Sequence, residues 1–148
     1  MKKGIVMFIW VVLLLVVGTA VYVRLAPSDQ GKWHKAASFQ SIEEKRGKGF
    51  YIWRQAVEDD GTAALAALDR IIRAEPRTAL LAGSLADEQL TYVSRSKVVG
   101  FPDYTTIGIY QTPDGQPYLE VFGRLRFGRS DLGVNAKRIK GWLRQLQV

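Results

Sequence analysis

An uninterrupted apolar run near the start of the chain constrains its structure more than any other feature. Residues 4–23 read GIVMFIWVVLLLVVGTAVYV and contain no charged side chain. At about 1.5 Å rise per residue, a helix of this length spans roughly 30 Å, the thickness of a bilayer's hydrocarbon core. Such a helix is apolar on all sides, so it is not expected as a buried helix of a small soluble protein. We therefore expect residues 1–24 to form a transmembrane anchor.

A cleaved signal peptide is the alternative for this segment. Gly18 and Ala20 form a small-x-small cleavage pattern, but the apolar run continues to Val23. Tyr22 and Trp33 are candidate anchors at the membrane interface. Basic residues flank the run on both sides, so charge does not decide the orientation. Because the tail before the run is very short, we expect the rest of the chain on the outer, periplasm-like side.

Composition narrows the function classes. The 148 residues include no cysteine and a single histidine, with a net charge of +7. Disulfides, thiol chemistry and a histidine-rich metal site are therefore excluded. We find no phosphate-binding loop, dinucleotide fingerprint or catalytic constellation, so we predict no enzyme, cofactor or metal. The basic charge favours anionic partners, with the lipid bilayer ahead of nucleic acid.

The remaining chain divides into a polar juxtamembrane linker, residues 25–47, and a folded domain, residues 48–148. We expect the linker to lie at the lipid headgroups through Trp33 and its lysines. In the domain, a strand over 49–56 precedes a helix that begins at Thr62 and stops before Pro76. Strand-like runs follow at 77–85, 89–99, 104–112 and 118–128, and a last helix runs from Ser130 or Asp131 to Leu146. This order predicts an α+β fold, an antiparallel meander of four to five strands packed with two helices.

The turn Pro113-Asp114-Gly115 predicts a three-residue hairpin loop. Its register pairs Thr112 with Gln116 and places apolar residues of both strands on one face, with Ile107 and Ile109 opposite Val121 and Leu119. The other face then carries aromatic and basic side chains, namely Tyr104, Tyr110, Tyr118, Phe122, Arg124 and Arg126.

The stretch RLRFGRSDLGVN, residues 124–135, has two interpretations. In the first it is a strand-to-helix corner in which Ser130, Asp131 and Asn135 cap the helix and Asp131 pairs with Arg126 or Arg129. In the second, Arg124, Arg126 and Arg129 bind an anion together with the helix N-terminus. Arg95 would extend this basic strip if the strands bring it close. The nearby FPD motif, Phe101 to Asp103, predicts a hairpin turn with a buried anchor.

Three motifs resemble one family. RLAPSD followed by WH, SRSKVVGFPDYTTI, and GRSDLGVNAKRI are similar to the family described as domain of unknown function 1499, which occurs in bacteria and plastids. The resemblance covers roughly Lys48 to Val148, and the membrane-anchored bacterial members also match the N-terminal span. It implies the α+β domain and a single span in a bacterial inner membrane, but no reaction.

The sequence is compatible with two binding functions, and it supports catalysis less than either of them. We favour a non-catalytic assembly module, such as an accessory component of an integral membrane protein complex, with the aromatic face as its interface. The alternative is a site for a lipid or small apolar ligand, lined by the same face. A hydrolase using Asp131 or Asp103 is less favoured. A pocket of several hundred Å³ would indicate a ligand, whereas a flat exposed aromatic patch would indicate a protein partner.

Overall fold

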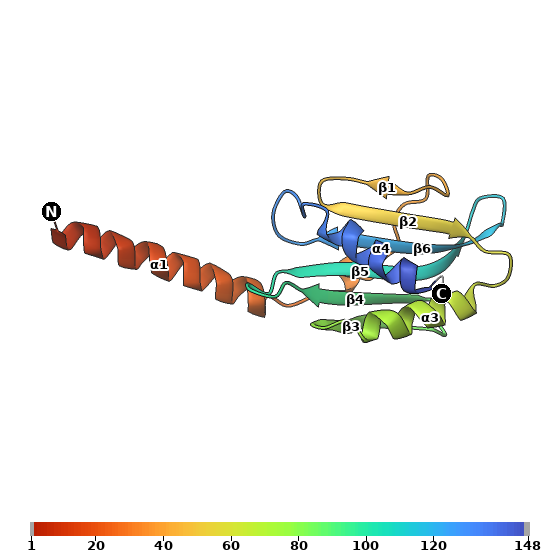
Figure 1. The fold of residues 1–148 in the computed structure, drawn as a ribbon, viewed down its shortest axis with the longest axis horizontal. Helices are drawn as coiled ribbons and strands as arrows, with labels where there is room; N and C mark the ends of the chain where they lie inside the picture. Colours follow the sequence, from red (N-terminus) through yellow and green to blue (C-terminus); the bar gives the residue numbers. More distant parts are fainter. Residues whose placement is uncertain (1, 147–148) are drawn as a thin grey trace.

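A computed structural model describes residues 2–146, so the predicted limits at residues 1 and 148 lie outside the described part. The chain forms a long N-terminal helix followed by a six-stranded antiparallel sheet with strand order β1-β2-β6-β5-β4-β3 (Figure 1). The elements are α1 (Lys2–Leu25), α2 (Gln30–Trp33), β1 (Lys45–Arg46), β2 (Phe50–Ala56), α3 (Thr62–Arg73), β3 (Thr78–Ser84), β4 (Gln89–Arg95), β5 (Pro102–Gln111), β6 (Pro117–Leu125) and α4 (Val134–Leu146).

The α+β class is confirmed, with one strand more than expected. The additional strand, β1, is a two-residue edge strand that pairs with β2 inside the predicted linker. Helix α1 lies outside the sheet domain, and its length and composition allow it to cross a membrane. Its most apolar stretch is not buried against the rest of the chain.

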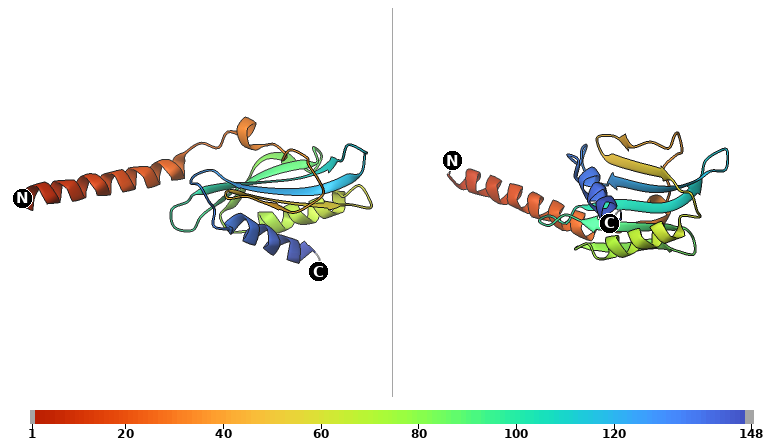
Figure 2. Two further views of the ribbon diagram at one scale, coloured as in Figure 1. Left: turned by 90° about the horizontal axis from the view of Figure 1, so that it is seen from above. Right: turned by 45° about the vertical axis from the view of Figure 1, so that its right-hand side comes forward.

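The main core lies between the sheet and helices α3 and α4, which cover one of its faces (Figure 2). Side chains alternate between the two faces of a strand, so every second residue of the central strands points toward these helices. The helices meet them with apolar stripes at helical spacing. The buried contributors are Leu65, Leu68 and Ile72 of α3, Ile139, Trp142 and Leu143 of α4, and Tyr51, Leu90, Tyr92, Ile107, Leu119 and Val121 of the sheet.

The predicted β5–β6 hairpin is confirmed in register. Ile107 lies opposite Val121 and Ile109 opposite Leu119. The backbone N–H of Thr112 donates to Gln116 O at 2.9 Å, which closes the three-residue loop. Gly115 has φ +85°, the left-handed conformation that such a loop requires.

Helix α3 begins at Thr62, one residue before the expected start after a Thr62 cap, whereas α4 begins a few residues later than predicted. Gly61, with φ +72°, holds the cap position of α3, and Asp60 Oδ1 accepts from the N–H of Thr62 at 3.0 Å. Helix α4 begins at Val134, after an Asp131 side chain that accepts from the N–H groups of Gly133 and Asn135 at 3.0 Å each. Among the described residues no ion pair joins Asp131 to Arg126 or Arg129, so that part of the prediction is wrong.

The β4–β5 connection also differs from expectation. Strand β4 ends at Arg95, not near residue 99, because Ser96 Oγ accepts from the N–H groups of Gly100 and Phe101 at 3.1 and 2.9 Å and tightens a turn. The buried residue of the FPD motif is Pro102, while Phe101 is 41% exposed. The buried anchor expected in this motif is thus Pro102, the first residue of β5.

The predicted linker is part of the fold. Residues 28–44, here called the cover segment, cross the sheet face opposite α3 and α4 (Figure 2). The Trp33 ring stacks on Tyr104 with centroids 4.0 Å apart, and His34 Nδ1 lies 2.9 Å from Thr91 Oγ1. Trp33 thus packs on the sheet, and its place at the lipid headgroups stays a prediction. The cover segment, with the short helix α2, therefore covers much of the second sheet face.

Candidate functional site: a cleft under the cover segment

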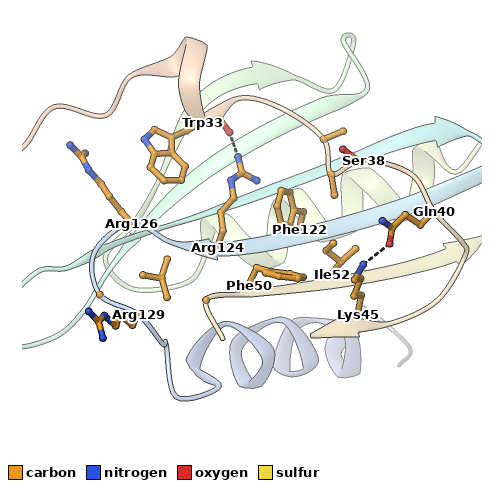
Figure 3. A pocket seen from close by; sticks show the side chains of 15 residues that line it. Trp33, Ser38, Gln40, Lys45, Phe50, Ile52, Phe122, Arg124, Arg126 and Arg129 are labelled. Atoms are coloured by element: carbon orange, nitrogen blue, oxygen red, sulfur yellow. Dashed lines mark hydrogen bonds between the residues drawn. The ribbon is translucent and has the colours of Figure 1, made fainter. Parts of the chain in front are cut away.

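A cleft of about 630 Å³ opens between the cover segment and the sheet, at the sheet end nearest α1 (Figure 3). Strand β6 forms its floor and β2 one side, because both strands turn every second side chain toward this face. Its lining residues are Trp33, Ala36, Ala37, Ser38, Gln40, Lys45, Gly49, Phe50, Ile52, Phe122, Arg124, Leu125, Arg126, Gly128 and Arg129.

One wall of the cleft is apolar. Phe50 and Phe122 meet edge to face with centroids 6.5 Å apart, and Ile52 lies opposite Phe122 in the β2–β6 register. Figure 3 shows these three side chains together on one side of the cleft. This wall suits a hydrocarbon or ring system.

Arg124 stands at the inner end of that wall. Its residue is only 9% exposed, and its guanidinium carbon lies 4.4 Å from the Phe122 ring centroid. Nη2 donates to the carbonyl of Trp33 and, at 3.1 Å, to Thr106 Oγ1. Within residues 2–146, Nη1 is buried without a hydrogen-bond partner. Burial lowers the pKa of Arg124 to about 10, so the guanidinium stays charged at neutral pH.

Further basic side chains surround the cleft mouth. Arg126 Nη1 donates to Pro27 O at 2.8 Å and to Tyr104 Oη at 3.0 Å. Arg129 is exposed in the loop after β6, and Lys45 of β1 donates to Gln40 Oε1. The cleft therefore combines one buried cation, a basic rim and an apolar wall.

A buried ion pair holds the cover segment over the sheet. Arg54 Nε lies 2.7 Å from Glu120 Oε2, and both side chains are almost fully buried. Arg54 also donates to the carbonyls of Ser38 and Ser41 at 3.1 Å each, and Glu120 Oε1 accepts from the N–H of Ala37 at 2.8 Å. Sequence reasoning missed this pair. A lone charge in the middle of each aromatic strand was the available signal.

A polar chain across the sheet positions Arg124. Thr91 Oγ1 and Thr106 Oγ1, on neighbouring strands, are 2.8 Å apart, and Thr106 in turn accepts from Arg124. His34 approaches Thr91 from the cover segment and also lies 3.1 Å from Gln89 Nε2. The histidine thus joins the cover segment to the sheet.

The structure brings together three of the predicted anion-binding residues and separates the others. Arg124, Arg126 and Arg129 line the cleft. Arg95 lies apart and donates to Gly100 O at 3.1 Å, so no continuous strip includes it. Asp131 and Asn135 belong to the α4 corner, where Asn135 Oδ1 accepts from Arg138 at 3.2 Å.

The predicted aromatic face is mostly covered. Tyr104 and Tyr118 are buried, and Phe39 of the cover segment packs on Tyr118 with centroids 5.2 Å apart. Tyr110 is half-buried and donates to Gln89 Oε1, and Phe122 faces the cleft. Tyr22 is exposed on α1 and contacts Phe127 edge to face at 6.3 Å.

The carboxylates considered for hydrolysis have structural partners. Burial raises the pKa of Asp103, which lies 3.6 Å from Arg138. Burial acts in the same direction on Asp131, but hydrogen bonds from the N–H groups of Gly133 and Asn135 outweigh it and hold the Asp131 pKa below its ordinary value. Among the described residues no three His, Asp or Glu side chains are grouped as a metal site.

Comparisons with known proteins give a family but no function. A family model described as "Protein of unknown function (DUF1499)" matches residues 30–146. The match begins upstream of Lys48 and so includes most of the cover segment. No curated protein matches the chain. The crystal structure of protein MLL2253 from Mesorhizobium loti is similar at a TM-score of 0.43 and 11% sequence identity, over 66% of this chain and 96% of that one.

Proposed function

The chain belongs to the DUF1499 family of proteins of unknown function, and we propose that it is a membrane-anchored binding domain whose cleft takes an anionic amphiphile. The observation that supports this most is Arg124, a guanidinium nine-tenths buried beside an apolar wall, with Nη1 unpartnered within residues 2–146. The ligand class is a phosphate or carboxylate attached to a short hydrocarbon or ring.

The anionic part follows from the cost of burying charge. A buried cation is stable only where hydrogen bonds and an opposite charge replace its hydration. Within residues 2–146, both hydrogen-bond acceptors of Arg124, the Trp33 carbonyl and Thr106 Oγ1, are neutral and bind Nη2. An acid group in the cleft would lie beside the Arg124 charge, and a small shift of this side chain would let Nη1 donate a charge-assisted hydrogen bond to it. Arg126 and Arg129 at the same cleft would attract that group.

The apolar part of the proposed ligand is inferred from the apolar wall and the volume of the cleft. Phe50, Ile52 and Phe122 offer a continuous hydrocarbon surface, and about 630 Å³ is within the usual range for small-ligand sites. Inorganic phosphate alone would leave this wall unused. A ligand that partitions into membranes would also meet a domain held at the bilayer by α1.

Assembly with an integral membrane protein complex has less support. An assembly module would use the aromatic face as its interface. Residues 28–44, however, cover Tyr104 and Tyr118 of that face. A cleft of this size instead meets the condition set for a ligand. Hydrolysis has less support still, because Asp103 and Asp131 are engaged by Arg138 and by the α4 backbone.

Calorimetry on the full chain in zwitterionic nanodiscs tests the proposal, with octyl phosphate, octanol and inorganic phosphate as titrants and empty nanodiscs subtracted. We expect octyl phosphate to bind at least tenfold more tightly than either other compound, because only it uses both the cation and the wall. Arg124→Met should weaken this binding by about tenfold or more, the value of one charge-assisted hydrogen bond.

Two further variants control for misfolding. Arg129→Ala removes an exposed cation of the cleft and should weaken binding severalfold without affecting folding. Arg70→Ala removes an exposed cation of α3, on the other side of the sheet, and should leave binding unchanged. Equal affinity for octanol and octyl phosphate, or wild-type binding by both cleft variants, would contradict the proposal.

A further inference from the structure

The turn between β4 and β5, residues 96–101, lies beside the C-terminal end of α1 (Figures 1 and 2). Gly100 faces the side chain of Arg24. Val99 and Phe101 line a hollow of about 360 Å³ together with residues of the helix, namely Leu15, Val16, Thr19, Ala20 and Val23. The turn therefore reaches back along the helix rather than stopping at its end.

This position has a consequence for depth in a bilayer. Thr19 and Ala20 belong to the apolar run of residues 4–23, so at about 1.5 Å per residue they lie roughly 5 Å inside its end. Side chains that share a hollow with them lie at the level of the outer hydrocarbon when α1 spans the membrane. The turn has exposed apolar side chains that suit the outer hydrocarbon, because Val98 is 84% and Phe101 41% exposed.

The loop between β6 and α4 adds an independent observation. Leu132 is 91% exposed and has φ +50°, a left-handed backbone that non-glycine residues rarely adopt. It lines a second hollow, of about 480 Å³, with Phe101, Phe127 and Lys97. Two loops thus present apolar side chains at the end of the domain where α1 joins it. Exposed apolar groups at one place indicate a contact surface.

Basic residues accompany these apolar side chains. Lys97 is exposed in the β4–β5 turn, Arg129 in the β6–α4 loop and Arg24 at the end of α1. A cation next to an inserted apolar group is typical of interfacial membrane contacts, where it pairs with anionic headgroups at about 1 kcal/mol per residue.

We propose that the β4–β5 turn inserts Val98 and Phe101 into the bilayer beside α1, with Leu132 as a second contact and Lys97 at the headgroups. The occupant of this surface is the lipid itself. The domain is then held to the membrane at two places, which fixes its tilt. This proposal does not depend on any ligand of the cleft.

Site-specific fluorescence on the full chain tests the insertion. The chain has no cysteine, so Val98→Cys gives a single attachment site for an environment-sensitive fluorophore on an exposed side chain. The protein is reconstituted into phosphatidylcholine vesicles, with and without phosphatidylglycerol. We expect blue-shifted emission, strong quenching by nitroxide-labelled lipids and at least threefold less quenching by iodide than at a water-exposed site. Phosphatidylglycerol should increase the lipid quenching.

Two reference positions make the outcome decisive. Asp114→Cys places the label in the exposed β5–β6 turn, at the opposite end of the sheet, and should respond to iodide only. Leu14→Cys places it in the apolar run of α1 and should respond to lipid quenchers only. Iodide quenching at position 98 equal to that at position 114 would overturn the proposal, and so would a label at position 14 that lipid quenchers do not reach.

Discussion

Arg54 and Glu120 face each other across β2 and β6, with 2% and 1% of their side chains exposed. Ion pairs buried in this way often stabilise little in total, because both charges lose their hydration. Here the pair also carries hydrogen bonds to three backbone groups of the cover segment, at Ala37, Ser38 and Ser41. We therefore interpret it as the device that fixes the path of this segment and so forms one side of the cleft.

A double-mutant cycle tests that interpretation. Arg54→Met and Glu120→Gln each leave a buried group without its partner, so each should lower the free energy of unfolding by about 3–5 kcal/mol. The double variant should cost clearly less than the sum, as expected for residues in contact. Urea denaturation gives the values.

An exposed ion pair provides the control for this cycle. Lys140 Nζ and Glu44 Oε1 are 2.9 Å apart, but their side chains are about half exposed. Lys140→Met should therefore change the free energy of unfolding by only about 0–1 kcal/mol. Additive effects of Arg54→Met and Glu120→Gln would mean that the buried pair does not act as a unit.

At the scale of elements, the features that depend on local sequence patterns could be predicted. Alternation together with one turn set the register of β5 and β6, and helical spacing set the buried side of α3. The path of residues 28–44 was not predictable in this way, because the segment has no periodicity and its contacts come from distant strands. Strand β1 was missed for the same reason, since two residues give no pattern.

The candidate site was predicted in part. The alternation of Arg124, Phe122 and Arg126 on one strand placed them on a common face, as observed. The wall formed by Phe50 and Ile52 depended on β2 pairing with β6, a long-range contact that the chain order does not reveal. The cleft itself arises only because Trp33 and its neighbours fold back over that face.

The start of α4 gives a prediction about pH. Hydrogen bonds from the N–H groups of Gly133 and Asn135 keep the pKa of Asp131 below its ordinary value, despite partial burial. A lowered carboxyl pKa stabilises the fold above the unfolded-state value of about 3.9, and this stabilisation is lost as pH falls through the folded-state pKa. Asp131→Ala should thus lower the free energy of unfolding by about 1 kcal/mol at pH 7.

The pH profile of that difference is the measurement. Urea denaturation between pH 7 and about pH 2 should show the difference between wild type and Asp131→Ala shrinking below roughly pH 4. Asp131→Asn keeps an acceptor for the helix N–H groups without the charge. Its free energy of unfolding at pH 7 should therefore lie between those of the wild type and Asp131→Ala. A difference that stays constant across the range would contradict a role for the ionised carboxylate.

For the whole molecule, the cover segment joins α1 to the cleft within a short length of chain. Just after α1, Pro27 O accepts from Arg126, and Ser28 Oγ lies 2.7 Å from Tyr104 Oη. Trp33 O then accepts from Arg124. The cleft therefore lies close to the point where the chain leaves α1, and a ligand in it would contact residues that directly follow this helix.

This arrangement predicts where the folded domain begins. A chain starting at Ala26 lacks α1 but keeps the cover segment. A chain starting at Lys48, the limit expected from sequence, keeps the Arg54–Glu120 pair but loses the hydrogen bonds of Arg54, Glu120 and Arg124 to residues 33–41. Each lost hydrogen bond to a charged group costs about 1.5–3 kcal/mol, against a total stability of about 5–15 kcal/mol. We expect the first chain to unfold cooperatively in urea and the second to be unfolded, or to lose most of its urea midpoint, by circular dichroism. Equal midpoints for the two chains would show that residues 28–44 only rest on the sheet and do not hold it together.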